Sequence, residues 1–218
     1  MCPCCSSLSE PTAKHFDAKR ASRILTAYRK SGPDRTTRGL LQGLAASGIR
    51  ARTLLDVGAG IGALTFELIE TGVANATCID LSQAFVESGQ AETQRLGFAQ
   101  RISWRVADFV AIAPSVPSAD LVTLDRVVCC YPAFEPLLHH AATHARVLLA
   151  MSYPRNRWFV RLVLAAENLL RQLRGNAFRS FVHPVSEMEA VLVGAGFRRV
   201  SHSRTLVWHM DVFRRDDT

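Results

Sequence analysis

A glycine-rich segment preceded by an acidic residue is the part of this sequence best suited to bind a charged ligand. The segment runs from Leu54 to Gly62 with the sequence LLDVGAGIG. Glycine lets a backbone turn tightly and lets a ligand approach without a Cβ in the way. A helix that begins behind such a turn offers N–H groups to a carboxylate or a phosphate. We therefore expect a ligand-binding loop; its members are Gly58, Ala59, Gly60 and Gly62.

Two kinds of ligand fit such a loop. Gly58, Gly60 and Ala63 also satisfy the dinucleotide fingerprint G-x-G-x-x-G/A, so a nicotinamide enzyme is one alternative. Asp56 favours another ligand, because an acidic side chain at the end of a strand would meet a cationic head group and repel a pyrophosphate. The amino group of a methionine moiety is such a head group. A P-loop is excluded, since no Gly-Lys-Ser/Thr follows.

Further acidic residues stand at the ends of the next apolar runs. Asp80, followed by Leu81, ends the second run, where a carboxylate can accept hydrogen bonds from both hydroxyls of a ribose. Asp108 and Phe109 follow the third run, where a carboxylate can hold an adenine amino group and an aromatic ring can cover the base. Asp125 closes the fourth run. Together they predict a nucleoside site at one edge of a sheet.

The elements that must position these residues alternate between strand and helix. Such βαβα alternation predicts a doubly wound α/β domain, a mostly parallel sheet with helices on both faces. The last two strands follow each other without a helix, so we expect an antiparallel hairpin at the end. Strands are expected at 52–57, 76–80, 102–106, 120–125, 145–152, 197–203 and 205–213, and helices at 13–30, 36–48, 61–70, 82–96 and 157–174.

The chain resembles a class I S-adenosylmethionine (SAM)-dependent methyltransferase of the small-molecule type, from about Thr36 to the C-terminus. The residues from Asp56 to Gly62 match the first motif of that family, Asp80 the acidic position after its second strand, and Asp108 its adenine-side position. The resemblance implies a seven-stranded sheet of order 3-2-1-4-5-7-6 with strand 7 antiparallel, and SAM as the cofactor. It also implies a tail and cap helix at 1–35 and a SAM-binding domain at 36–218.

The segment after the fourth strand, DRVVCCYP, should lie beside the transferred methyl group. Arg126 is a candidate substrate residue and Tyr131 a candidate catalytic residue; the alternative is that both only brace the loop. Cys129 and Cys130 are either nucleophiles or small buried residues. The segment lacks both the Asn/Asp-Pro-Pro-Tyr/Phe motif of enzymes that methylate adenine or cytosine amino groups and the Pro-Cys pair of cytosine-C5 enzymes.

Histidines supply the candidates for a general base and for a metal site. His183 precedes Pro184, which predicts a rigid loop near the substrate, and it is our candidate general base. His140 and His144 are one helical turn apart, but no Glu stands between them as in His-Glu-x-x-His. We expect them to be surface or packing residues, and we expect no metal.

Two segments are candidate covers for the ligand. The first is the N-terminal helix, which carries Phe16 and Tyr28, and Tyr28 is a candidate substrate residue. The second is the segment from Arg157 to Arg174, expected to be a helix. Its apolar residues occupy more than one face of that helix, and arginines stand at its edges. It could cover an apolar acceptor, pack as a lid, or lie on a membrane surface as a basic amphipathic helix.

The composition limits which partners and which cellular compartment can be expected for this protein. The 218 residues carry a formal net charge of +7, which favours anionic surroundings. No stretch is long and apolar enough for a bilayer crossing, and no secretory signal is seen, so we expect a cytoplasmic protein whose cysteines, including Cys2, Cys4 and Cys5, are thiols.

These observations favour methylation of a small-molecule acceptor by in-line displacement. A nucleic-acid methyltransferase rests on charge alone and is not expected. A membrane-surface or scaffold protein with a vestigial SAM site is the remaining alternative, and a dehydrogenase is the weakest.

Overall fold

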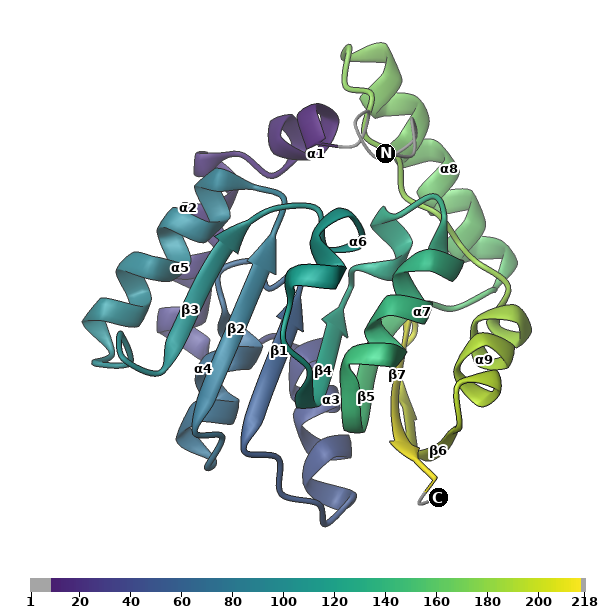
Figure 1. The fold of residues 1–218 in the computed structure, drawn as a ribbon. Coiled ribbons are helices and arrows are strands. Elements are labelled where there is room, and N and C mark those ends of the chain that lie inside the picture. The colour runs from purple at the N-terminus through teal and green to yellow at the C-terminus, as the bar shows by residue number, and fades with distance from the viewer. Residues whose placement is uncertain (1–8, 217–218) are drawn as a thin grey trace.

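The computed structural model describes residues 9–216, so Cys2, Cys4 and Cys5 lie outside the described residues. In this part of the chain one sheet has seven strands in the order β3-β2-β1-β4-β5-β7-β6 (Figure 1). Strand β7 runs antiparallel to both of its neighbours, and the other pairs are parallel. The predicted fold class, strand order and direction of the seventh strand are therefore confirmed.

The strands and helices have the following bounds. The strands are β1 (Thr53–Val57), β2 (Asn75–Asp80), β3 (Ile102–Val106), β4 (Ala119–Asp125), β5 (Ala145–Pro154), β6 (Phe197–Arg204) and β7 (Trp208–Arg215). The α-helices are α1 (Ser9–His15), α2 (Ala18–Ser31), α3 (Arg35–Ala46), α4 (Ala63–Glu70), α5 (Gln83–Arg95), α6 (Phe109–Ile112), α7 (Phe134–His144), α8 (Trp158–Leu173) and α9 (Val185–Gly194).

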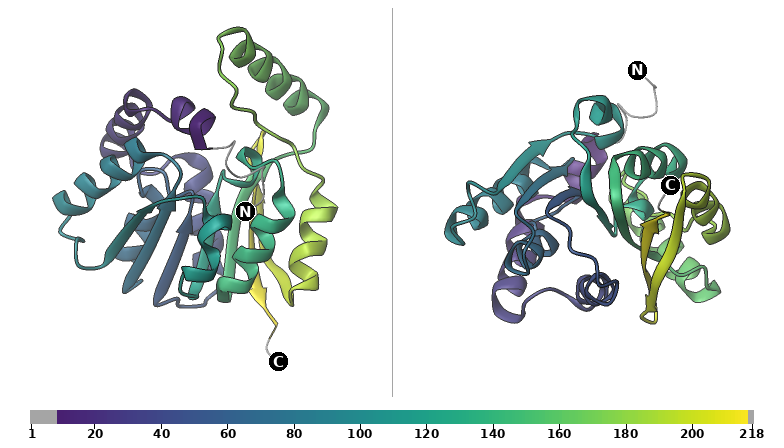
Figure 2. Two further views of the ribbon diagram at one scale, coloured as in Figure 1. Left: turned by 45° about the horizontal axis from the view of Figure 1, so that its top comes forward. Right: turned by 60° about the horizontal axis from the view of Figure 1, so that its bottom comes forward.

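The sheet buries both of its faces. Successive side chains of a strand point to opposite faces, so a strand in the middle of three layers must be apolar on both. Leu54 and Leu55 of β1 illustrate this, because both are buried but belong to different core clusters. Helices α3, α4 and α5 cover one face and α6, α7 and α9 the other, and α2 packs outside α5 (Figures 1 and 2).

The N-terminal helix expected at 13–30 is in fact two helices. The break falls at Phe16 and Asp17, between α1 and α2. The Asp17 carboxylate accepts a hydrogen bond from the Arg20 amide at 2.8 Å and so caps a new helix. An aspartate favours such a cap because it satisfies an N–H group that has no partner inside the helix.

The last strand begins at Trp208, three residues later than expected. Residues 205–207 form the turn between β6 and β7, because the Thr205 hydroxyl oxygen accepts hydrogen bonds from the amides of Val207 and Trp208. This β6–β7 turn lies at the same edge of the sheet as the start of α8, since the Arg155 amide donates to the Val207 carbonyl at 2.7 Å.

Helix α8 extends beyond the carboxyl edge of the sheet, with Arg157 and Arg174 as its caps (Figures 1 and 2). It occupies the place where an inserted helix after the fifth strand was predicted. Among the helices at residues 9–216, none is long and apolar enough to cross a membrane.

Candidate active site

The glycine loop joins β1 to α4 at the carboxyl edge of the sheet. Its glycines at 58, 60 and 62 have φ values of 64°, 59° and 86°, which favour residues without a Cβ. At Gly58 a Cβ would lie 2.4 Å from Val127 Cγ2, and at Gly62 it would lie 2.9 Å from Phe66 and Trp104. At Gly60 the nearest atom would be a Phe85 carbon at 3.6 Å. Packing therefore demands glycine at 58 and 62, whereas at position 60 a Cβ would make only ordinary van der Waals contact.

Asp80 connects this loop to the end of β2. One carboxylate oxygen accepts a hydrogen bond from the Gly60 amide and the other from the Ser82 amide, each at 2.8 Å. Burial raises the pKa of Asp80, although the amides of Ser82, Gly60 and Leu81 oppose that shift. Each carboxylate oxygen has a second lone pair, so Asp80 can accept further hydrogen bonds from a ligand in the cavity that it lines.

Asp56 lies deeper, at 2% exposure. Its two carboxylate oxygens accept hydrogen bonds from the hydroxyls of Thr65 and Thr123, each at 2.7 Å. Burial raises the pKa of Asp56 to about 7, against an ordinary value of 3.8, because these neutral donors do not compensate its charge. A cationic ligand group in the cavity would favour the ionised form of Asp56. Its role toward a methionine amino group stays a prediction.

Asp108 and Tyr131 form a pair on the other side of the loop. The Tyr131 hydroxyl lies 3.1 and 3.0 Å from the two carboxylate oxygens of Asp108. Asp108 also caps α6 by accepting the Val110 amide at 3.0 Å. Phe109 is buried and packs edge-on against His144, while all three predicted residues line the same cavity. Tyr131 therefore lies beside Asp108, on the side of the cavity where the adenine is predicted.

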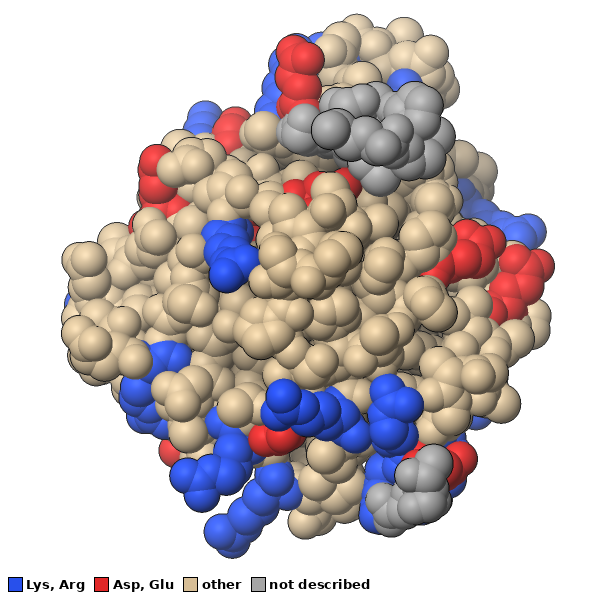
Figure 3. All heavy atoms as spheres, in the orientation of Figure 1, with Lys and Arg blue, Asp and Glu red and all other residues tan. Residues whose placement is uncertain are grey.

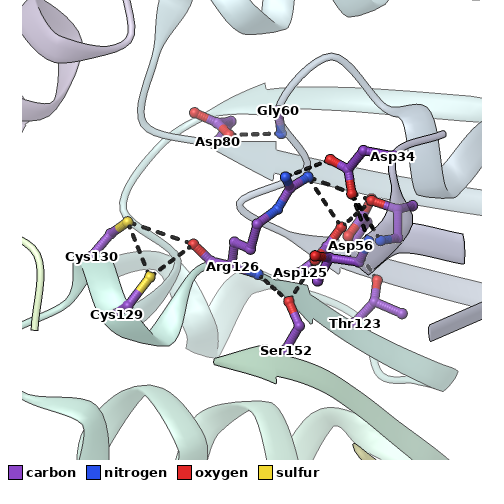
Figure 4. A network of polar contacts seen from close by, with 12 residues as sticks. Asp34, Asp56, Gly60, Asp80, Thr123, Asp125, Arg126, Cys129, Cys130 and Ser152 are labelled. Atoms are coloured by element: carbon purple, nitrogen blue, oxygen red, sulfur yellow. Dashed lines mark hydrogen bonds and ion pairs between the residues drawn. The ribbon is translucent and has the colours of Figure 1, made fainter. Parts of the chain in front are cut away.

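Arg126 lies beside the end of β4 in a left-handed backbone conformation, with φ 61° (Figure 4). Such a conformation is strained in a residue with a long side chain. Three backbone contacts hold it: its amide donates to the Ser152 hydroxyl at 2.8 Å, and its carbonyl accepts from the thiols of Cys129 and Cys130 at 3.4 and 3.5 Å.

The side chain of Arg126 points toward Asp34, the N-cap of α3 (Figure 4). Its guanidinium binds the Asp34 carboxylate at 2.5 Å and lies 3.4 Å from Asp125. Asp125 in turn accepts hydrogen bonds from the hydroxyls of Thr37 and Ser152, each at 2.5 Å. The predicted substrate residue Arg126 therefore lines the cavity while it braces α3 against β4.

His183, the candidate general base, braces the loop after β4. Its Nε2 lies 3.1 Å from the carbonyl oxygen of Val128 and 3.0 Å from that of Tyr131, to which it donates. Its ring packs beside Phe134 and Phe181, and His183 is absent from the residues that line the cavity. This placement gives no support to proton abstraction by His183.

The paired cysteines differ in exposure. Cys129 is buried, and its contact with Cys130 together with burial raises its pKa well above the ordinary value. A neutral thiol is a poor nucleophile, so Cys129 is best described as a small buried residue. Cys130 is partly exposed and lines the cavity.

Neither ring nitrogen of His144 faces the cavity. Nδ1 and Nε2 lie 2.7 and 2.9 Å from the backbone carbonyls of His140 and Ala113. Within residues 9–216, no group of three or more His, Cys, Asp or Glu side chains is arranged to hold a metal ion.

The cavity measures about 830 Å³ and reaches well beyond the predicted motif. Its roof comes from α1, α2 and the break between them, together with α8; Phe16 in the break and Tyr28 of α2 were expected as a cap. The Tyr28 hydroxyl donates to Glu67 at 3.0 Å; burial and then Glu67 raise its pKa. Val160 of α8 and Trp208 of β7 supply an apolar wall.

The sequence did not reveal a pair of arginines in the cavity wall, one on α2 and one on α8. Arg20 and Arg171 both line the cavity, and the Arg20 guanidinium lies 2.8 Å from Nε2 of His15. Burial and then the charges of these two arginines lower the pKa of His15 to about 4, so that its ring is neutral and accepts from Arg20. No pattern in the sequence distinguishes these arginines from the many others.

Comparisons with known proteins agree with this geometry. Residues 54–148 match a family model described as a methyltransferase domain. No curated protein matches the sequence.

Solved structures with the same fold include several methyltransferases. Magnesium protoporphyrin IX methyltransferase from Synechocystis PCC 6803, with bound SAH, is 18% identical, with 95% of this chain and 99% of that chain covered and a TM-score of 0.70. Human N-acetylserotonin methyltransferase in complex with SAM is 18% identical, with 92% and 56% covered and a TM-score of 0.65. The N-methyltransferase NodS from Bradyrhizobium japonicum WM9 is 15% identical, with 84% and 95% covered and a TM-score of 0.58. At these identities the likeness establishes the fold.

The family model covers the glycine loop, Asp80, Asp108 and the strand that ends at Asp125. Residues 54–148 thus match a methyltransferase domain, and the strand order of the whole sheet is that of the class I methyltransferase fold, whose members use SAM as the methyl donor.

Proposed function

We propose that this chain transfers the methyl group of SAM to a small-molecule acceptor that has an apolar part. One observation carries the proposal: a continuous cavity of about 830 Å³ is lined at one end by the glycine loop and Asp80 and at the other by apolar side chains of α8 and β7. Pockets of about 300–1,000 Å³ suit small molecules. A donor and an acceptor can therefore share one enclosure.

The residues at the motif end fit SAM. Three glycines with positive φ form a cradle that lines the cavity at Gly58 and Gly60, where the backbone carries no Cβ toward a ligand. We assign Asp80 to the ribose hydroxyls, Asp108 and Phe109 to the adenine, and Asp56 to the methionine amino group. When bound, SAM supplies a methyl group on a sulfonium, which is already activated for displacement.

The chain's own contribution is to orient the acceptor and exclude water. Helices α1 and α2 and helix α8 roof the cavity, and orientation inside such an enclosure can lower a barrier by several kcal/mol, about 7 or more in the best cases. We assign Arg20 to an anionic group of the acceptor; Arg171, which is paired with Glu167, lies beside it in the cavity. Arg126 and Tyr28 hold the roof in place through Asp34 and Glu67.

On the face shown in Figure 3, the charge distribution gives the nucleic-acid alternative no support. Most of the Lys and Arg side chains on this face gather along its lower edge (Figure 3). This edge carries the amino-terminal ends of the parallel strands, whereas the cavity lies at their carboxyl ends (Figure 1). A nucleic acid held by these charges would not reach the glycine loop.

Calorimetric titration with SAM, S-adenosylhomocysteine and NAD tests the cofactor assignment. We expect binding of both sulfur nucleosides and none of NAD. Incubation with methyl-labelled SAM and a panel of lipophilic acids, phenols and amines then tests the acceptor class through label in the organic extract. Binding of NAD alone, or of none of the three, would overturn the proposal.

A further inference from the structure

Helix α8 exposes an apolar face to solvent. Trp158, Leu162, Leu169 and Leu173 are 77%, 62%, 57% and 75% exposed. Their spacing of four, seven and four residues places them on one side of the helix. We call these four residues the outward face. A helix on the surface of a soluble monomer normally turns its polar side outward, so this arrangement is unusual.

The opposite side of α8 is tied to the protein. Val160 is the buried residue of this helix, and Leu164 lines the cavity. The Asn168 side chain donates to the Ser180 carbonyl at 2.8 Å and accepts the Ser180 amide at 2.9 Å. Contacts on this side therefore hold α8 in place. They keep the outward face in solvent and away from the hydrophobic core.

Arginines border the outward face. Arg157 and Arg174 cap the two ends of the helix, and Arg161 lies one turn in from the start. The only acidic residue from Arg157 to Arg174 is Glu167, which lines the cavity and binds Arg171 at 2.5 Å. The outward face is thus apolar and bordered by positive charge, and the one acidic side chain of this segment lies on the cavity side, paired with Arg171.

The same surface continues onto the β6–β7 turn. Leu206 in this turn is 73% exposed, and its carbonyl accepts a hydrogen bond from Arg155 at 3.3 Å. Arg155 stands three residues before α8 begins, so the exposed turn lies next to the start of the helix.

We propose that this surface docks on an anionic lipid membrane, with the outward face in the boundary between headgroups and acyl chains and the arginines on the headgroups. Apolar anchors bordered by basic residues are what such binding requires. A second copy of the chain fits less well, because both copies would carry a net charge of +7.

Docking also specifies the source of the acceptor. Val163, Leu164 and Val207 line the cavity, while their neighbours on α8 and in the β6–β7 turn form the docking surface. A molecule that leaves the lipid beside α8 meets the apolar end of the cavity first. This step rests on the proposed function and specifies the acceptor as a lipophilic molecule supplied by the membrane. The docking itself is independent of the methyl transfer.

Co-sedimentation with vesicles tests the docking surface. The purified chain is mixed with vesicles of equal parts phosphatidylcholine and phosphatidylserine, or with phosphatidylcholine alone. We expect binding to the anionic vesicles that weakens at high salt, and a blue shift of tryptophan fluorescence that the Trp158→Phe variant lacks. The double variant Leu162→Glu/Leu169→Glu should lose affinity by about tenfold or more, because each side chain no longer transfers favourably into the lipid.

Val193→Glu is the matched control, because Val193 of α9 is 59% exposed and lies on another helix. It should bind vesicles like the unaltered chain, and all variants should bind SAM equally without lipid. Equal vesicle binding by the double variant, or no binding by the unaltered chain, would overturn the proposal. So would a dimer in light scattering that the double variant abolishes, because a second copy would then cover this face. Failure of SAM binding with vesicle binding intact would reject the proposed function alone.

Discussion

The guanidinium of Arg126, the residue after β4, binds the carboxylate of Asp34, the N-cap of α3. This contact spans 92 positions of sequence and closes one side of the cavity. It combines a strained backbone with an ion pair whose partners are 41% and 48% exposed. Exposed pairs contribute little by themselves, about 0–1 kcal/mol. The value of Asp34 to the fold therefore lies mainly in its capping of α3.

Substitution of Asp34 separates these two roles. One carboxylate oxygen accepts the amides of Thr36 and Thr37, and the other accepts from Arg126. Asp34→Ala removes both and should lower the free energy of unfolding by about 1–2 kcal/mol. Asp34→Asn keeps the cap and should cost less than about 1 kcal/mol. Urea denaturation measures both, and equal stability of Asp34→Ala and the unaltered chain would contradict the capping role.

The same residue gives a pH dependence of stability. Burial alone would raise the pKa of Asp34, but Arg126 and the amides of Thr37 and Thr36 outweigh it and hold the pKa below its ordinary value. A depressed pKa stabilises the fold above the ordinary pKa and loses that effect as the pH falls through the lowered value. The stability advantage over Asp34→Asn should therefore shrink below about pH 4. An advantage that grows on acidification would contradict this.

Asp80→Ala should weaken SAM binding by about tenfold or more, because the ribose would lose its acceptor and the Gly60 amide its partner. Asp120→Ala is a matched control. Asp120 likewise accepts two backbone amides, those of Arg52 and Thr53, but it lies at the opposite edge of the sheet and does not line the cavity. Calorimetry should show unchanged SAM affinity for Asp120→Ala. Equal losses in the two variants would mean that Asp80 acts only through stability.

The features that could be predicted from the sequence are those fixed by local pattern. Apolar alternation and the glycines at 58, 60 and 62 predict the strands and the loop, because each depends on residues close in sequence. The split between α1 and α2 depends on one aspartate side chain, which outweighs a continuous helical pattern. The roles of Arg126 and His183 depend on partners far away in the chain, Asp34 and the carbonyls of Val128 and Tyr131. No local pattern carries such information.

Gly58→Ala should destabilise the fold more than Gly97→Ala. Both glycines have similar φ, 64° and 75°, so both substitutions bear the cost of a left-handed conformation, about 1–3 kcal/mol. A Cβ at Gly97 meets nothing within 4 Å, whereas one at Gly58 lies 2.4 Å from Val127 Cγ2. Adding Val127→Ala to Gly58→Ala should therefore recover part of the loss in thermal denaturation. Equal costs for the two glycines would show that the loop moves to admit the extra carbon.

The proton on Asp56 offers a direct test of its predicted role toward the amino group of SAM. Burial raises the pKa of this carboxyl to about 7 in the folded chain, above its ordinary value of 3.8. A raised folded-state pKa means that the fold binds this proton more tightly than the unfolded chain does. The resulting stability is fully present below the ordinary pKa and is lost as the pH rises through about 7. Asp56→Asn should lack this decline. In urea denaturation, the free energy of unfolding of the unaltered chain should therefore fall relative to that of Asp56→Asn between pH 5 and 8.

A cationic amino group beside Asp56 would favour the ionised carboxylate and expel the proton. Calorimetric titration with SAM near neutral pH, repeated in buffers of different ionisation enthalpy, should therefore detect proton release from the unaltered chain that exceeds the release from Asp56→Asn. The comparison cancels any ionisation of SAM itself, because both proteins bind the same ligand. Equal proton release, with SAM affinity retained in the variant, would show that Asp56 serves only Thr65 and Thr123 and that another group meets the cation.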